Sequence, residues 1–283
     1  WSSDVGSSDL IEHARVKTTP GRAKTTDRTA RLRRQVLDPA RQVAAFDLEN
    51  TLIASNVVAN YSWLATRRLD RGERLRYIAR TLAEAPSLLR LDRRDRTDFL
   101  RHFYRRYEHA PMEQIEEDVT AMMTHLVLTK SFPEGIRRVR EHRAAGHRTI
   151  LITGALDFNV AGLRPLFDEI VAAEMSVRPD GTLSGEMTTV PPTGEARAQL
   201  LADYCDAEGF RMEECVAYAD SSSDLPLFEA VGFPVAVNPE TRLAAIARKR
   251  GWLVEHWSKA AGGPRPLLPI APFGDERLRR GGR

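Results

Sequence analysis

Two short apolar runs, far apart in the chain, each end in an aspartate. Residues 43–47 read Val-Ala-Ala-Phe-Asp, and residues 215–220 read Cys-Val-Ala-Tyr-Ala-Asp. A short apolar run of this kind is typical of a strand that is buried on both faces of a parallel sheet. A third run, residues 149–153, ends in the hydroxyl of Thr153. Ligands of open α/β sheets bind at the carboxyl ends of the strands, so these runs predict an α/β fold whose polar strand ends meet at one edge.

The spacing of apolar residues divides the chain into a core and an insertion. Apolar residues three and four positions apart recur through residues 57–129, which predicts an inserted all-helical cap domain. Residues 41–56 and 130–258 form the predicted core, with a helix at 133–145, a hairpin around Asp180-Gly181 and further strands at 234–238 and 252–254.

The two ends of the chain lack this periodicity. Residues 1–40 are polar and rich in Ser, Thr and Arg, which predicts a linker or disordered segment with one helical turn near Arg28 to Leu37. Residues 259–283 are rich in Pro, Gly and Arg, which predicts a disordered basic tail. The chain begins with Trp1 and no signal-peptide pattern follows, so we expect a fragment of a longer protein without a secretory leader.

Composition excludes several classes of protein. A chain of 283 residues with 42% hydrophobic residues can build a folded core, which excludes fibrous and wholly disordered proteins. The longest uncharged stretch, from Asn50 to Thr66, contains polar residues throughout, so we expect no transmembrane segment and a soluble protein. Cys205 and Cys215 are too few for a disulfide framework and lack zinc-site spacing, which favours the cytoplasm.

The charge is small overall but unevenly distributed. The net charge is +3, yet residues 67–106 hold 13 arginines against six acidic residues. Solvated helix faces account for such a run, and the alternative is a surface that attracts anions near a site for a phosphorylated substrate. No recognised nucleic-acid motif accompanies the arginines, so we expect no nucleic-acid partner.

Oxygen-bearing side chains cluster at the predicted strand ends, namely Asp47, Thr51, Thr153, Asp220 and Asp224. Carboxylates that share one edge repel each other unless a cation lies among them. Oxygen ligands suit Mg²⁺, which commonly also engages a substrate phosphate. An aspartate beside that metal can attack phosphorus, and hydroxyls such as those of Thr153 and Ser221 can hold the transferring oxygens.

These residues resemble the motifs of haloacid dehalogenase superfamily hydrolases, subfamily IB, the subgroup similar to phosphoserine phosphatase, over about residues 43–257. The first motif, Asp-x-Asp-x-Thr, corresponds to Asp47-Leu48-Glu49-Asn50-Thr51. The second motif corresponds to Ile152-Thr153-Gly154, and the fourth, Gly-Asp-Ser-x-x-Asp, to residues 219–224. The helical insertion stands where this subgroup carries its C1-type cap. The resemblance thus implies a Rossmann-like parallel-sheet core with an inserted all-helical cap.

The resemblance also implies roles for these residues, in a Mg²⁺-dependent phosphomonoester hydrolase that forms a phospho-aspartate intermediate on a small phosphorylated metabolite. Asp47 is the expected nucleophile, and Thr51 supports its loop. The expected metal ligands are Asp47, the backbone carbonyl of Glu49 and Asp220, with Asp224 acting mainly through water or hydrogen bonds. Thr153, Gly154 and Ser221 are the expected phosphoryl-binding residues.

Two positions depart from the family pattern. Glu49 replaces the aspartate that serves as general acid and base, and failure of its longer side chain to reach the leaving oxygen would cost about 10²–10⁴ in rate. If that length is a defect, Glu49→Asp raises activity. In Gly194-Glu195-Ala196-Arg197, Arg197 takes the place of the catalytic lysine and binds phosphate, although a surface position for Arg197 is the alternative.

These departures leave two hypotheses open. The first is an active phosphatase, and the second is a degenerate domain that binds metal and phosphate with little turnover, as a regulatory or structural module of a larger multidomain protein. Members of the subgroup are sometimes fused to lipid-modifying or reductase domains. The cap residues name no substrate, so amino acid, lipid and sugar phosphates all stay open. Val57, Val58, Tyr61 and Trp63 either form an apolar lip for an acyl chain or membrane surface, or pack within the cap.

Overall fold

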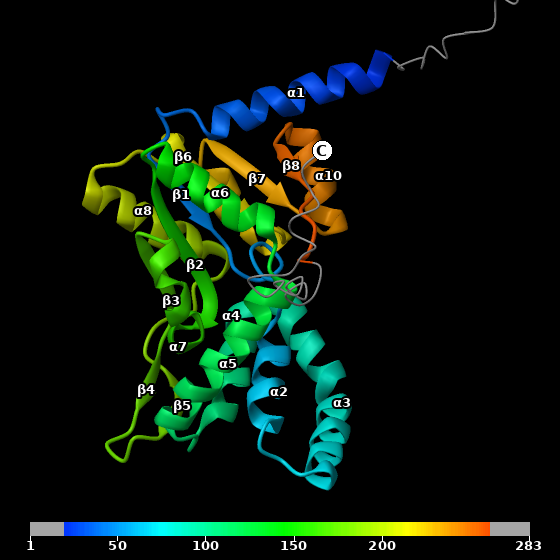
Figure 1. Ribbon diagram of the computed structural model, residues 1–283, viewed down its shortest axis with the longest axis vertical. Helices are drawn as coiled ribbons and strands as arrows, with labels where there is room; N and C mark the ends of the chain where they lie inside the picture. Colours follow the sequence, from blue (N-terminus) through cyan, green and yellow to red (C-terminus); the bar gives the residue numbers. More distant parts are fainter. Residues whose placement is uncertain (1–19, 261–283) are drawn as a thin grey trace, which may run out of the picture.

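The computed structural model describes residues 20–260 and contains a six-stranded parallel sheet (Figure 1). The strand order is β3-β2-β1-β6-β7-β8. The bounds are β1 Val43–Phe46, β2 Arg148–Leu156, β3 Glu169–Ala173, β6 Cys215–Ala219, β7 Phe233–Val237 and β8 Leu253–Glu255. In the register of the sheet, Phe46 lies between Leu151 of β2 and Tyr218 of β6. The predicted α/β fold is therefore confirmed, with β1 at the centre of the sheet.

Helices cover both faces of the sheet. Val43 and Ala45 of β1 belong to a buried cluster formed with three helices, α8 (Gly194–Glu208), α9 (Leu225–Ala230) and α10 (Thr241–Arg250). Ala44 and Phe46 belong to a second cluster, which includes Val139 of α6 (Pro133–Ala144). Because successive side chains of a strand point to opposite faces, burial on both sides explains why the run at 43–46 is continuously apolar.

Between the loop that follows β1 and the start of α6, residues 57–130 fold into the helices of the predicted cap. These are α2 Val57–Thr66, α3 Arg71–Arg94, α4 Arg96–Tyr104, η1 Arg105–Tyr107 and α5 Met112–Lys130. Side-chain caps at Asn56, Asp70 and Asp95 begin the first three of these helices. The cap lies beyond the ends of the strands toward which the arrows of β2 and its neighbours point (Figure 1). Within residues 20–260, none of the helices combines the length and apolar character needed to cross a membrane.

The predicted hairpin forms and contacts the cap. Its strands are β4 (Met175–Val177) and β5 (Leu183–Met187). The amide of His109 donates to the carbonyl of Leu183 at 2.9 Å, the amide of Leu183 donates to the carbonyl of Ala110 at 2.8 Å, and the amide of Met112 donates to the carbonyl of Gly181 at 3.0 Å. The cap is thus attached by this hairpin as well as by its two chain connections.

The first described element corrects the expected linker. Helix α1 spans Pro20–Val36, where the sequence predicts a linker with a single helical turn. Val36 is buried and Leu32 packs beside it, while Arg33 donates to the carboxylate of Glu255 at 2.6 and 2.8 Å. Contacts with the core, and not apolar periodicity, stabilise this helix. Residues 1–19 of the predicted linker and residues 261–283 of the predicted tail lie outside the described residues.

A line of buried polar groups runs beside β1. His147 Nε2–H donates to the carbonyl of Asp38 at 3.0 Å, so its Nδ1 accepts from His142 Nδ1–H at 2.7 Å. His142 Nε2 then accepts from the hydroxyl of Tyr218 at 2.7 Å, and Arg138 donates to that hydroxyl at 3.4 Å. Burial, with smaller contributions from His147 and Arg138, lowers the pKa of His142 to about 2. Both histidines therefore stay neutral in the folded protein at neutral pH.

Candidate active site

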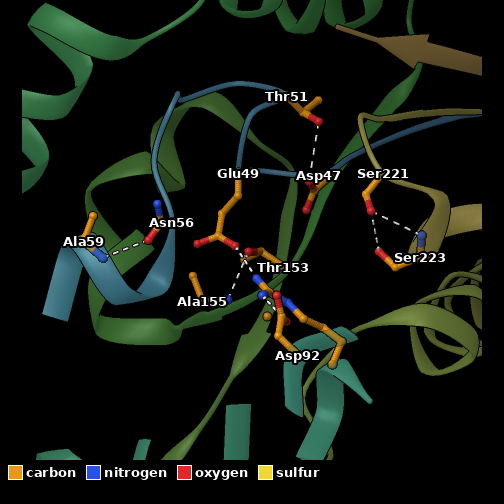
Figure 2. Close-up of polar contacts among 12 residues, drawn as sticks. Asp47, Glu49, Thr51, Asn56, Ala59, Asp92, Thr153, Ala155, Ser221 and Ser223 are labelled. Carbon is orange, nitrogen blue, oxygen red and sulfur yellow. Dashed lines mark hydrogen bonds and ion pairs between the residues drawn. The ribbon is translucent and has the colours of Figure 1, made fainter. Parts of the chain in front are cut away.

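A tight loop follows β1 and carries the first motif. The amide of Asp47 donates to the carbonyl of Tyr218 at 2.9 Å, which aligns the end of β1 with β6. Asn50 has a φ of 55°, in the left-handed region that Asn tolerates better than most residues. This turn brings Asp47, Glu49 and Thr51 onto one loop, and the hydroxyl of Thr51 donates to Asp47 Oδ2 at 3.4 Å (Figure 2).

Arg197 of α8 reaches the same point. It is only 5% exposed, so the alternative of a surface position is wrong. Its Nη2 lies 2.9 Å from Asp47 Oδ1, its Nη1 pairs with Asp224 Oδ1, and its Nε–H donates to the carbonyl of Pro192 at 3.3 Å. The planar guanidinium therefore joins two carboxylates at once, which the single ammonium of a lysine does less readily.

Three aspartates could hold a metal ion. Asp47, Asp220 and Asp224 each offer a carboxylate oxygen, and these oxygens lie within 4.8 Å of one another. Burial and the neighbouring carboxylates raise the pKa of Asp220 to about 8, and burial raises the pKa of Asp224 to about 6 although Arg197 opposes it. Such mutual repulsion is what a bound cation relieves. A cluster of hard oxygen donors fits Mg²⁺.

Glu49 faces the cap. Its Oε2 accepts from Arg96 Nη2 at 3.0 Å, and Arg96 also donates to Asp92 Oδ1 at 2.7 Å. Glu49 Oε1 is buried and has no hydrogen-bond partner among the described residues. Burial raises the pKa of Glu49 to about 7, although Arg96 acts in the opposite direction. Arg96 could not be identified from the sequence, because one arginine among the 13 of residues 67–106 carries no local signal of its partner.

The remaining predicted residues differ in how directly they reach the site. Thr153 Oγ1 is buried and accepts from the amide of Ala155 at 3.1 Å, whereas Ser221 Oγ accepts from the amide of Ser223 at 3.3 Å (Figure 2). A Cβ on Gly154 would lie 2.8 Å from the Cδ1 atom of Leu100 of α4, so a larger residue there would have to displace that side chain.

One cavity of about 970 Å³ joins most of these groups. Its lining includes seven of the predicted site residues: Asp47, Glu49, Gly154, Arg197, Asp220, Ser221 and Asp224. Thr51 and Thr153 are not among the described residues that line it. Thr51 reaches Asp47 through its hydroxyl, and the phosphoryl contact expected of Thr153 stays a prediction.

The predicted apolar lip divides into two parts. Val57 and Val58 line the cavity. Tyr61 instead packs within the cap, with its ring centroid 4.8 Å from that of Tyr107 and its hydroxyl donating to the carbonyl of Arg106 at 2.8 Å.

Comparisons with known proteins agree with this geometry. The profile of the haloacid dehalogenase-like hydrolase family matches residues 44–229. A probable phosphatase of Mycobacterium tuberculosis is 30% identical over 225 residues, which make up 78% of this chain and 77% of that protein. The inhibition of morphological differentiation protein of Streptomyces azureus is 32% identical over 143 residues, 50% of this chain and 51% of that protein, so the chain spans about half of that relative. A substrate-bound phosphoserine phosphatase structure has a TM-score of 0.56 at 17% identity, covering 76% of this chain and 92% of that one, which shows a shared fold.

Proposed function

The chain belongs to the haloacid dehalogenase-like hydrolase family, and we propose that it is a phosphatase that hydrolyses phosphomonoesters with Mg²⁺ through a phospho-aspartate intermediate. The observation that carries this proposal is the cluster of Asp47, Asp220 and Asp224, whose oxygens lie within 4.8 Å of one another at the strand ends. Glu49 and Arg197 line the same cavity, so a nucleophile, an acid and a cation converge there.

In the first step, the carboxylate of Asp47 attacks phosphorus and the bond from phosphorus to the ester oxygen breaks. Glu49 gives its proton to the departing alcohol oxygen, for which its unpartnered Oε1 is suited. Thr51 restrains Asp47 through Oδ2, and Arg197 balances the charge at Oδ1.

In the second step, water attacks the phosphorus of the acyl phosphate. Glu49, now a carboxylate, takes a proton from that water, and the bond between phosphorus and the Asp47 oxygen breaks to release inorganic phosphate. When bound by the three aspartates and the carbonyl of Glu49, Mg²⁺ supplies positive charge close to the phosphoryl oxygens. Ser221 and Gly154 line the cavity, and we propose that they contact those oxygens.

The test is hydrolysis of p-nitrophenyl phosphate and a panel of phosphorylated metabolites by purified protein with and without Mg²⁺. We expect Mg²⁺-dependent turnover that falls to background in Asp47→Asn, because an amide is a much poorer nucleophile than a carboxylate. Asp206→Asn, at an exposed position on α8, is the matched control and keeps full activity. Equal signal from the wild type and Asp47→Asn across the panel would favour the degenerate binding domain.

Two further predictions concern the setting of the protein. Fusion to another catalytic domain is a prediction from the family resemblance, and a cytoplasmic location is a prediction from the cysteine content.

A further inference from the structure

The cavity is larger and more apolar on its cap side than a small polar metabolite requires. Its volume of about 970 Å³ is at the upper end of the roughly 300–1,000 Å³ that ligand pockets span. Val57 of α2, Leu88 and Leu89 of α3 and Phe99 of α4 line it from the cap. The phosphoryl-binding groups occupy the opposite side, at the strand ends. Asp92, Arg94 and Arg96 also line the cap side, so the apolar residues form one part of that wall.

Most carboxylates of the cavity already have a contact or a proposed role. Three of them are the aspartates of the proposed metal site. Glu49 Oε2 and Asp92 Oδ1 accept from Arg96, and Glu240 Oε1 accepts from the amide of Ser222 at 2.9 Å. Glu49 Oε1 has no partner among the described residues, but it is the oxygen proposed above to carry the proton for the leaving group, so an ammonium group bound there would block the proposed acid.

An apolar track continues from the cavity along α3. Leu89 lines the cavity yet is 55% exposed, and Leu82, Ile78 and Leu75 are 68%, 45% and 67% exposed. Their spacing of seven, four and three residues places them on one face of the helix. With a rise of 1.5 Å per residue, the track from residue 89 to residue 75 is about 21 Å long. Because this stripe starts at the cavity wall, a chain that fills the cavity can extend along it.

Two arginines in the cavity wall favour an anionic head group. Arg94 and Arg242 line the cavity, and both residues are exposed. Two such cations attract a phosphomonoester dianion toward the entrance of the site.

Building on the proposed phosphatase function, we propose that the substrate is an amphiphilic phosphomonoester. Its phosphate lies at Asp47, its apolar chain lies against Leu88 and Leu89, and a longer chain follows α3 over Leu82. The apolar wall gains contact with each methylene that it removes from water, so affinity rises with chain length until the chain extends past the wall.

Monoalkyl phosphates from ethyl to decyl, kept below their micelle concentrations, test this assignment. We expect kcat/KM to rise about two- to fourfold for each methylene that is buried, and phosphoserine to rank below hexyl phosphate. Leu89→Ser should abolish the rise of kcat/KM with chain length over the whole series. Leu82→Ser should abolish this rise only for the longest chains. Leu128→Ser removes an equally exposed leucine, 52% exposed on α5 and outside the cavity lining, and leaves the series unchanged.

Calorimetric binding of the matching alkylphosphonates, which cannot be hydrolysed, separates this inference from the phosphatase proposal. If no substrate shows turnover that depends on Asp47, the phosphatase proposal is wrong. Binding of the phosphonate series still tests the apolar site in that case. A flat phosphonate series, or a preference for phosphoserine, overturns the amphiphile assignment. So does a Leu82→Ser variant that loses adsorption to anionic vesicles but keeps the wild-type alkyl series, because the track would then contact a membrane surface and not the substrate.

Discussion

Replacing Arg197 by methionine removes the buried cation between two buried carboxylates. In the wild type, Nη2 lies 2.9 Å from Asp47 Oδ1 and Nη1 pairs with Asp224. Breaking a buried ion pair by removing one partner typically costs about 3–5 kcal/mol, because the remaining charge is left uncompensated. For a domain of this size, that loss lowers Tm by roughly 6–20 °C.

Thermal unfolding in the presence of EDTA measures this effect without a bound cation. Added Mg²⁺ should raise the Tm of Arg197→Met by more than it raises the Tm of the wild type, because a more negative cluster binds the metal more tightly. Arg197→Lys, which keeps the charge but loses the fork, should fall between the two proteins.

Two controls sharpen the experiment. Arg242→Met removes an exposed arginine from the same cavity and should change the free energy of unfolding by less than about 0.5 kcal/mol. Adding Asp224→Asn to Arg197→Met should restore part of the stability, since it removes one stranded charge. A Tm within about 2 °C of the wild type for Arg197→Met would refute the reasoning.

Three further predictions concern the acid, the cap contact and the histidines. Glu49→Gln should lower kcat by about 10²–10⁴. The kcat of Glu49→Asp should lie between those of the wild type and Glu49→Gln, because the shorter side chain loses one methylene of its reach to Arg96. A Glu49→Asp variant with a higher kcat than the wild type contradicts this. Gly154→Ala should cost about 1–3 kcal/mol in urea unfolding, since its Cβ meets Leu100, and an unchanged midpoint would disprove the clash. Because the pKa of His142 is lowered to about 2, His142 is protonated in the unfolded chain below pH 6.5 but stays neutral in the folded chain down to about pH 2. Stability should therefore fall by up to about 1.4 kcal/mol per pH unit below pH 6.5, and this slope should be shallower in His142→Gln if the burial argument holds.

The strand ends could be predicted because their signal is local. Asp47 and Asp220 directly follow β1 and β6, and parallel pairing of those strands brings them together whatever lies between them. The expected strand end at Thr153 is wrong, because β2 continues to Leu156. Arg197 could be placed only through the motif order of the family. Its position on α8 relative to Asp47 depends on how that helix packs against the sheet, which short-range periodicity does not specify.

The residues that the sequence did not reveal depend on contacts between distant segments. Arg96 meets Glu49 only after α4 folds over the strand ends, and 47 positions separate the two residues. Helix α1 is polar along most of its length, so its formation depends on Leu32, Val36 and the pairing of Arg33 with Glu255. Windowed periodicity cannot detect such partners, because each of them lies on another element.

The hairpin that bonds to the cap has a consequence for how ligands come and go. A lid joined only by its two chain ends can swing about that joint. Here β5 and the turn before it also hold residues 109–112 through three backbone hydrogen bonds, and Arg178 pairs with Glu108 at 2.7 Å. Any swing must break these bonds or carry the hairpin along. We therefore expect substrate and product to exchange through an entrance that stays open while the cap is in place. The rate of product release should then depend on the shape of the product and not on how often the cap opens.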